Sequence, residues 1–365
     1  MKKRVALLLA ALTLTAALSG CGKSKTEPEV KASEATSLTE TSEEETTRPE
    51  TTIKAFTEPA ADEITPEDVT VRVGSLKGPT SMGLVSLMDK AARGEAGNQY
   101  DFTMVTAADE LLGKIVSNNM DIALVPANAA SVLYNKTDGG IAVIDINTLG
   151  VLYVVASDDS IQSFADLKGK TLYLNGKGTT PEYVINYLLS ANGLTADDVT
   201  LEFKSEAAEV AAILKEQPGA IGLLPQPFVT AACAQNEDLR IVLDCTAQWE
   251  ALQGFGGSRL VTGVTIVRKD FQDEYPNAVA LFLQEHAAST EFANTNLDKT
   301  AELVAAQGII EKAPIAKIAI PYCNITCITG EEMKTALSGY LQVLADQNPA
   351  SVGGQLPGDD FYFNP

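Results

Sequence analysis

The sequence has few of the residues that enzymes use most often for catalysis and metal binding. One histidine and one tryptophan occur among its 365 residues, together with five cysteines. A single histidine argues against a mixed Cys/His metal site and leaves general acid–base chemistry to carboxylates or lysines. Neither G-x-S-x-G nor H-E-x-x-H is present. We therefore expect no catalytic residues, no cofactor and no metal.

Positive charge and long apolar runs are also scarce. The chain has 27 Lys and Arg against 48 Asp and Glu, a formal net charge of −21 at pH 7. Because nucleic-acid binding rests on basic side chains that meet phosphates, this balance argues against a nucleic-acid partner. After the N-terminal 20 residues no stretch is long and apolar enough to span a membrane. The hydrophobic share of 45% is ordinary for a globular protein.

The N-terminus has the parts of a secretion signal. Basic residues at positions 2–4 precede the apolar run VALLLAALTLTAAL, which is too short to span a bilayer comfortably. The run ends in LSGC at Cys21, and this resembles the lipobox of bacterial lipoproteins, whose cysteine is lipidated and becomes the mature N-terminus. An uncleaved anchor with an incidental cysteine is the alternative. We expect residues 1–20 to be a signal peptide and the lipid to tether the protein to a membrane face.

Residues 21–67 are rich in Thr, Glu, Ser and Pro and nearly free of large apolar side chains. Such a segment cannot bury enough surface to offset its ordering entropy, so we expect a disordered acidic tether. A flexible chain of about 45 residues has a root-mean-square reach of roughly 35–40 Å. The tether would lift a folded body off the lipid and still let it meet a membrane partner.

Four cysteines remain if Cys21 carries the lipid: Cys233, Cys245, Cys323 and Cys327. Four cysteines in an exported protein permit disulfides, and the sequence leaves the pairs Cys233/Cys245 and Cys323/Cys327 open. The last two could also bind a metal or be small buried apolar residues.

The body of the chain repeats one arrangement at an offset of about one hundred residues. VRVGSLKGPTSMGLVSLMDKA and LYLNGKGTTPEYVINYLLSAN each read as a strand, a glycine loop and a helix, with Gly78 and Gly178 one hundred apart. Farther along, Pro126 and Pro225 open equivalent helices ninety-nine residues apart. This β-α-β-α order predicts an α/β protein with two lobes, each a mainly parallel sheet flanked by helices.

Two β-rich segments fit the crossings between these lobes. GVLYVVAS begins at residue 150 and RLVTGVTIVRKDF begins at residue 259, and the helices after them return to the first lobe. We therefore expect a two-strand hinge. The expected division is 68–155 plus 262–365 for the first lobe and 156–261 for the second.

Ligands of open α/β sheets gather outside the carboxyl ends of the strands. Each lobe puts its special loops at that edge, and each loop starts a helix whose N-terminus carries partial positive charge and unpaired N–H groups. A cleft between the lobes would suit a carboxylate, sulfonate, phosphate or polar heterocycle. Any one loop taken alone is better explained by helix capping, so the prediction depends on the agreement of four loops at one edge.

The motifs taken together resemble a known family. The lipobox, the acidic tether, VGSLKGPTSMGL, DIALVPANAASVLYNK, GKGTTPEYVINYLL, LLPQPFVTAA and GGQLPGDDFYF look like those of bacterial ABC-transporter solute-binding lipoproteins. The nearest branch includes binders of nitrate, aliphatic sulfonates and thiamine precursors. The resemblance implies a type II periplasmic-binding fold and capture of a small polar or anionic solute by hinge closure. It also implies a monomer that delivers to an ABC permease driven by a cytoplasmic ATPase, either on the outer face of the bacterial cytoplasmic membrane or in the periplasm.

The resemblance also places the ligand-binding candidates. They are Gly78, Pro79, Thr80, Ser81, Met82, Pro126, Ala127 and Asn128 in the first lobe, and Gly178, Thr179, Thr180, Pro181, Pro225, Gln226 and Pro227 in the second. Thr80 and Thr179 would supply hydroxyls, Asn128 and Gln226 amides, and Met82 an apolar contact. No arginine stands in these loops, which argues against a bidentate clamp on a tetrahedral anion.

Two alternatives stay open at this stage. A two-lobed enzyme of cofactor or quinone-precursor metabolism could use the same fold, although the loops offer no nucleophile–base pair. Trp249 could line the cleft or lie in a core, and Tyr183 and Tyr187 could cover the second lobe. His286 lies in a helix among Ala and Glu, so we expect an exposed helix residue.

Overall fold

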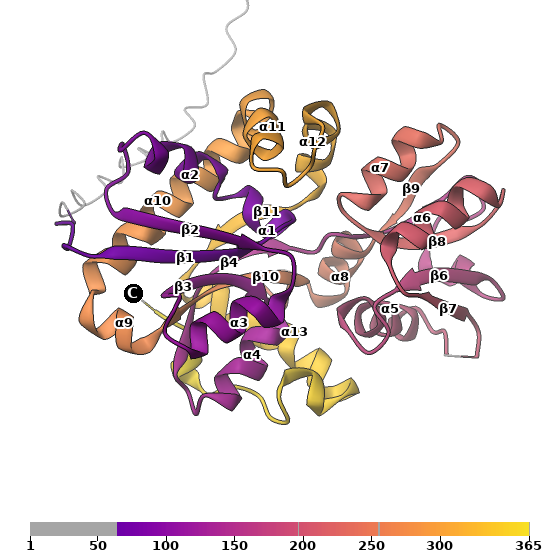
Figure 1. Ribbon diagram of the computed structural model, residues 1–365. Helices are drawn as coiled ribbons and strands as arrows, with labels where there is room; N and C mark the ends of the chain where they lie inside the picture. Colours follow the sequence, from indigo (N-terminus) through magenta and orange to yellow (C-terminus); the bar gives the residue numbers. More distant parts are fainter. Residues whose placement is uncertain (1–63, 196, 255, 365) are drawn as a thin grey trace, which may run out of the picture. The chain divides into compact units, whose positions relative to one another are not determined.

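The computed structural model describes residues 64–195, 197–254 and 256–364. The predictions for the signal peptide, for lipidation of Cys21 and for nearly all of the tether fall outside these residues. In the described part the chain forms two β-sheets, each flanked by helices (Figure 1). Within that part, no helix combines the length and apolar character that a membrane crossing requires.

The first sheet has six strands in the order β11-β4-β10-β3-β1-β2. They are β1 Thr70–Leu76, β2 Gln99–Val105, β3 Ile122–Pro126, β4 Ile141–Leu149, β10 Val261–Arg268 and β11 Ile325–Ile328. β1 pairs in parallel with β2 and β3, whereas β10 runs antiparallel between β3 and β4. β11 is antiparallel to β4 at the edge, so four of the six strands run the same way.

The second sheet has five strands in the order β7-β6-β8-β5-β9. They are β5 Leu152–Ala156, β6 Thr171–Asn175, β7 Thr200–Lys204, β8 Ile221–Pro225 and β9 Arg240–Asp244. β6 pairs in parallel with β7 and β8, and β5 runs antiparallel between β8 and β9. Each sheet therefore holds an antiparallel strand at the equivalent place, β10 in the first and β5 in the second, and the first sheet has another, β11, at its edge.

The helices connect these strands in chain order. Those with the first sheet are α1 Pro79–Met82, α2 Val85–Ala92, α3 Ala108–Val116, α4 Ala127–Lys136, α9 Lys269–Glu274, α10 Pro276–Thr295, α11 Leu297–Ala306, α12 Ala313–Ala319 and α13 Gly330–Gln347. Those with the second are α5 Thr180–Ala191, α6 Ala207–Glu216, α7 Phe228–Gln235 and α8 Cys245–Gln253. Short 3-10 turns are η1 Phe164–Leu167, η2 Ile320–Tyr322, η3 Pro349–Val352 and η4 Asp359–Phe361.

Side chains that alternate along the strands give each sheet two apolar faces. In the first sheet Val73 and Ile122 pack against α2 and α10, whereas Ala123 and Val125 pack against α3 and α4. Figure 1 shows α2 and α10 on one side of this sheet and α3 and α4 on the other. Because both faces are covered, the middle strands are apolar almost throughout, as parallel strands usually are.

The two sheets share one internal spacing. In each, the first strand pairs with the second at an offset of 29 residues and with the third at an offset of 49. The pairs are Thr70 with Gln99 and Val73 with Ile122 in the first sheet, and Thr171 with Thr200 and Leu172 with Ile221 in the second. The repeat expected from the sequence is therefore a repeat of strand register as well.

The chain passes between the sheets twice. It leaves the first sheet at Leu149, joins the second at Leu152, and returns to the first at Val261. The expected division at residue 155 put β5 in the first lobe, but β5 pairs with β8 and β9 of the second sheet. The change of sheet comes at Gly150, because each crossing segment forms an antiparallel strand of the sheet that it enters.

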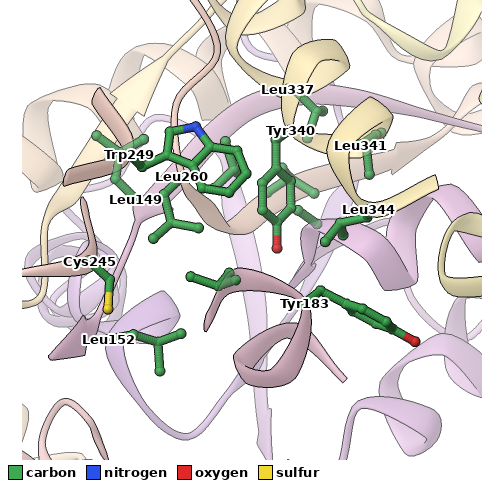
Figure 2. Close-up of a cluster of buried hydrophobic side chains, with 14 of the residues drawn as sticks. Leu149, Leu152, Tyr183, Cys245, Trp249, Leu260, Leu337, Tyr340, Leu341 and Leu344 are labelled. Atoms are coloured by element: carbon green, nitrogen blue, oxygen red, sulfur yellow. The ribbon is translucent and has the colours of Figure 1, made fainter. Parts of the chain in front are cut away.

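One apolar cluster joins the two lobes. Figure 2 shows Leu337, Tyr340, Leu341 and Leu344 of α13 beside Trp249 of α8, Tyr183 of α5 and the crossing-segment residues Leu149 and Leu260. Trp249 is fully buried and its ring lies 5.7 Å from that of Tyr340. Of the two readings left open for Trp249, the structure therefore gives the core position, at a contact between α8 and the C-terminal helix.

The prediction that His286 is exposed is wrong. Its side chain is 0% exposed, because α10 packs against β11 and α2 as well as the sheet. Its Nδ1 lies 3.1 Å from Asp145 Oδ2 on β4, and Thr265 Oγ1 donates to the other carboxylate oxygen at 2.8 Å. The four cysteines of the described residues are free, and Cys327 lies on β11 rather than on a helix.

A buried carboxylate fastens the amino ends of the strands opposite the predicted loops. Asp121, only 1% exposed, accepts from Arg72 Nε at 2.8 Å and from the Arg72 backbone N–H at 2.9 Å. Arg268 Nη2 lies 3.5 Å from its other oxygen. The hydrogen bond to Asp121 raises the pKa of Arg72, against a smaller opposing effect of burial. This one side chain thus links β1, β3 and β10.

Replacing Asp121 by alanine should lower the free energy of unfolding by about 1–3 kcal/mol, because it removes charge-assisted hydrogen bonds to Arg72 and leaves the largely buried Arg268 guanidinium without its carboxylate. Urea unfolding followed by circular dichroism measures this. Asp89→Ala is the matched control, since Asp89 pairs with Arg93 at the surface, and its midpoint should stay near that of the parent protein. Equal midpoints for the two variants would contradict the clamp.

Candidate functional site

The two predicted loops of the first lobe meet at Gly263 on β10. Gly263 pairs with Pro126 on one side and Thr148 on the other. A Cβ placed on Gly263 would lie 2.6 Å from Thr80 Cγ2 and 2.5 Å from Asn147 Oδ1. Glycine is therefore required here by the close approach of α1 and β4. Both loops lie beside the strand that returns from the second lobe.

The Pro225–Pro227 loop of the second lobe reaches the other crossing segment. Gln226 N donates to Val151 O at 2.9 Å, and Pro225 pairs with Leu152. The Gln226 side chain is 2% exposed and accepts from Thr230 Oγ1 at 2.9 Å. Its Nε2 is buried and, among the described residues, has no hydrogen-bond partner. The loop that begins α4 thus lies beside one crossing segment, and the loop that begins α7 lies beside the other.

The glycine loop of the second lobe approaches α13. Tyr183 Oη donates to Gly178 O at 3.1 Å, and Asn348 Nδ2 donates to Tyr183 Oη at 2.9 Å. Burial raises the pKa of Tyr340 to about 12, and a hydrogen bond with Thr180 opposes this rise. The Tyr183 hydroxyl therefore links the Gly178 loop to Asn348. This contact is compatible with the prediction that Tyr183 covers the second lobe.

The C-terminal segment also touches the N-terminal part of α4. Ser131 Oγ donates to Val352 O at 2.7 Å, and Asn128 Nδ2 lies 3.4 Å from Ser351 O. Since Asn348 of the same segment bonds Tyr183, residues 347–352 bridge α4 of the first lobe and α5 of the second. Three of the four predicted loops lie beside the crossing segments, and the fourth reaches them through α13.

The predicted residues differ in accessibility. Those that are exposed or half-buried are Gly78, Pro79, Pro126, Asn128, Gly178, Thr179, Thr180, Pro181, Pro225 and Pro227. Those that protein atoms cover are Thr80, Ser81, Met82, Ala127 and Gln226. Met82 packs in a cluster with side chains of α11 and α12, and Ser81 Oγ donates to Leu76 O and to Ser75 Oγ. The side chains of Ser81 and Met82 make their contacts inside the first lobe, so they are not available to a ligand.

The helix N-termini differ in a way that the sequence did not reveal. No side chain within the described residues caps α4, which begins after Pro126. At α7, which begins after Pro227, the uncharged Gln226 Oε1 accepts from Thr230 N at 3.4 Å. At the α5 loop, by contrast, the Glu182 carboxylate accepts from Gly178 N. A carboxylate at that position already meets the positive end of the helix dipole. The α4 and α7 termini are therefore the better places for an external anion.

Two lysines that the sequence analysis did not single out stand directly before the loop glycines. Lys77 and Lys177 are exposed, and neither forms an ion pair with any residue that the structure describes. Lys177 Nζ lies 5.6 Å from the Phe203 ring centre. The one-hundred-residue repeat contained this signal, since the two lysines occupy equivalent positions in it.

Three exposed apolar side chains lie near the α7 loop. They are Phe228, at 40% exposure, Ile318 of α12 and Tyr322 of η2. Tyr153 Oη of β5 donates to Tyr322 O at 2.8 Å, and α7 contacts α12. Sequence reasoning missed all three, because periodicity cannot tell which apolar side chain a neighbouring helix will leave uncovered.

A surface pocket of about 860 Å³ opens elsewhere, between α8 and α13. Its lining includes Glu250, Glu331, Glu332 and Arg259. The Arg259 guanidinium already pairs with Glu250, at 3.0 Å and 2.9 Å, so it is not free for an anion. With three carboxylates and one committed arginine, this pocket is a poor site for an anionic solute, and it is distinct from the four predicted loops.

Comparison with known protein families and sequences points to the binding proteins of transporters. Residues 90–300 match the family described as ABC transporter, phosphonate, periplasmic substrate-binding protein. Proteins of Brucella abortus and Brucella suis that are named as binding proteins are 21% identical over 286 residues, which is 77% of this chain and 85% of theirs.

Solved structures share the fold. An ABC transporter protein from Parabacteroides distasonis has a TM-score of 0.68 at 22% identity, covering 81% of this chain and 99% of its own. The periplasmic aliphatic sulphonate binding protein SsuA from Escherichia coli has a TM-score of 0.64 at 14% identity, covering 81% and 92%. A Candida albicans protein described as having the generic periplasmic binding protein fold matches at 0.50, with 15% identity and coverage of 80% and 93%.

The two-lobed α/β fold and the solute-binding role expected from the sequence are thereby confirmed. Members of this family are substrate-binding components rather than enzymes, and they act outside the cytoplasm. The chain belongs to the family of periplasmic substrate-binding proteins of ABC transporters.

Proposed function

We propose that the protein captures a small organic anion of the phosphonate or sulfonate kind between its lobes and passes it to an ABC permease. One feature carries the proposal: α4 and α7, equivalent helices of the two halves, each begin beside a crossing segment and have no acidic residue in the first turn. Their N–H groups and partial positive charge suit an anion. The description of the matching family names phosphonate, and the structurally similar E. coli protein is named as an aliphatic sulphonate binding protein.

The remaining loop residues would complete the site when the lobes rotate together about the two crossing segments. Asn128 and Thr179 would then reach the solute from opposite lobes. Lys77 and Lys177 would add positive charge at the rim, where it speeds the encounter with an anion more than it strengthens the final complex. The N-termini of α4 and α7 and these lysines together make up for the absence of arginine in the loops.

The exposed apolar side chains near α7 suggest what the uncharged part of the solute is like. Phe228 is the first residue of α7, and Ile318 and Tyr322 belong to α12, which contacts α7, and to η2, which follows α12. Binding sites are usually lined by apolar and aromatic groups with a few well-placed polar ones. An alkyl or aryl substituent on the anion would therefore find contacts that a bare inorganic ion would not use.

The scheme extends to the membrane. A lipid on Cys21 would hold the mature protein on the outer face of the cytoplasmic membrane, and the tether 21–67 would let it reach the permease and the cytoplasmic ATPase behind it. The protein would act as a monomer, since one two-lobed body supplies both sides of the cleft. The enzyme alternative is weaker, because the loops bring together no nucleophile–base pair among the described residues.

A ligand screen tests the proposed solute class. At one hundred times its dissociation constant a true ligand should add about 2.7 kcal/mol of stability, seen as a higher melting temperature. Alkylphosphonates and alkanesulfonates should do this, whereas the matching alcohols, which lack the anionic group, should not. Stabilisation by the alcohols and not by the anions would contradict the proposal.

Asn128→Asp tests the place of the anion. The new carboxylate lies in the first turn of α4, where it should stabilise the helix and yet repel an anionic ligand. We expect unchanged or higher stability, together with binding weaker by about 1–3 kcal/mol in isothermal titration. Asn119→Asp, the same change before β3 at the amino ends of the strands, is the control and should bind like the parent. Equal affinities for both variants would remove the ligand from α4.

Trp249 provides a reporter of lobe closure, because it is the only tryptophan of the chain. It packs against Tyr340 of α13 and Tyr187 of α5, and its Nε1 donates to Ser258 Oγ at 3.2 Å. Rotation of the lobes would alter these surroundings. Saturating ligand should therefore change tryptophan emission, and acrylamide should quench the free protein poorly. A ligand that raises the melting temperature while leaving the emission unchanged would count against closure about this contact.

A further inference from the structure

A second cluster of chemically active side chains lies inside the first lobe, away from the proposed solute site. It consists of Asp145 on β4, His286 on α10 and Cys327 on β11, whose ligand atoms all lie within 4.8 Å of one another. We propose that these three residues bind one divalent metal ion of the zinc class, which fastens α10 and the edge strand β11 to β4. The proposal is independent of the solute.

The donor types support zinc over magnesium or calcium. A thiolate, an imidazole and a carboxylate are the ligands that zinc takes, whereas the hard cations prefer oxygen alone. His286 Nδ1 and Asp145 Oδ2 are 3.1 Å apart. Two donors at that separation, each roughly 2.0–2.2 Å from a zinc ion, subtend an angle of about 100°, close to the tetrahedral value.

The surroundings of Asp145 resemble the support that metal ligands need. Thr265 Oγ1 donates to Asp145 Oδ1 at 2.8 Å, and Asn147 Nδ2 donates to Thr265 Oγ1 at 3.1 Å. These bonds fix the carboxylate and leave Oδ2 directed at His286. Outer hydrogen bonds of this kind hold metal ligands in orientation.

A structural Asp–His pair uses one nitrogen of the imidazole, here Nδ1 of His286, and leaves the second nitrogen without a role. His286 Nε2 is buried and lacks a hydrogen-bond partner among the described residues, and so does Thr290 Oγ1. A Cβ on Gly83 would lie 3.4 Å from the first atom and 3.0 Å from the second, so both border the same space. A metal-bound imidazole usually gives its second N–H to such an oxygen.

Cys327 is the point at which a metal ion would enter the cluster from solvent. Unlike Asp145 and His286, it is partly exposed, and it lies on the edge strand of the sheet. Its thiol is free. Because the thiolate is the form that ligates a metal, binding would release the thiol proton when the sulfur–metal bond forms. The expectation of no metal rested on the single histidine of the chain, and that histidine belongs to this cluster.

Metal retention tests the proposal in the intact chain without a polyhistidine tag. The protein is loaded with Zn²⁺ and desalted, and bound zinc is measured by plasma mass spectrometry. We expect about one ion per chain for the parent and at least a tenfold loss of affinity in Cys327→Ser. Cys323→Ser is the matched control, because Cys323 Sγ bonds Ala319 O outside the cluster, and it should retain zinc as the parent does. Both variants keep the net charge, so weak binding to the acidic surface is the same in each.

Cobalt gives an independent readout. Co²⁺ in the site should produce a thiolate-to-cobalt absorption band in the parent and in Cys323→Ser, and not in Cys327→Ser. Circular dichroism verifies that the variants are folded. No retained zinc in the parent, or equal retention and equal cobalt spectra in parent and Cys327→Ser, would overturn the proposal.

Discussion

The contact between α13 and the crossing segments is the interaction on which the rest of the structure depends. Trp249 and Tyr340 are almost fully buried there, in one cluster with Leu149 and Leu260. Removing a buried aromatic side chain of this size typically costs about 3–5 kcal/mol, so the contact is strong relative to the net stability of a domain. It fixes the two segments that join the sheets, and the loops at the strand ends take their positions from them.

The equal register of the two sheets explains why equivalent loops of the two lobes lie beside the crossing segments. Offsets of 29 and 49 residues recur in both, so the third strand of each sheet ends in a proline loop beside a crossing segment. Pro126 pairs with Gly263 and Pro225 with Leu152, which are residues of the two antiparallel strands. Two copies of one loop are thereby brought to the same hinge, although each taken alone would be an ordinary helix start.

The sequence predicted the lobes, the repeat and the loops because glycine, proline and apolar periodicity act over a few residues. It could not predict the burial of His286, since the polar and small residues around it in α10 resemble an exposed face, and packing against β11, α2 and Asp145 of β4 covers it. The sequence could not predict the burial of Met82 either, because α11 and α12, which cover it, follow it by more than two hundred residues. The change of sheet at Gly150 depends likewise on which strand β5 pairs with.

A chain with a net charge of −21 can bind an anion only through local features of its surface. Charges farther away than a Debye length, about 8 Å at physiological ionic strength, are largely screened. At the α5 loop the nearest charge is unfavourable, because Glu182 already occupies the Gly178 N–H. At α4 no described side chain competes, and at α7 the uncharged Gln226 Oε1 accepts from Thr230 N at 3.4 Å. The charged group of the solute should therefore lie toward Asn128 and the α7 loop, and a carboxylate introduced beside Gly178 should weaken binding less than one introduced at Asn128.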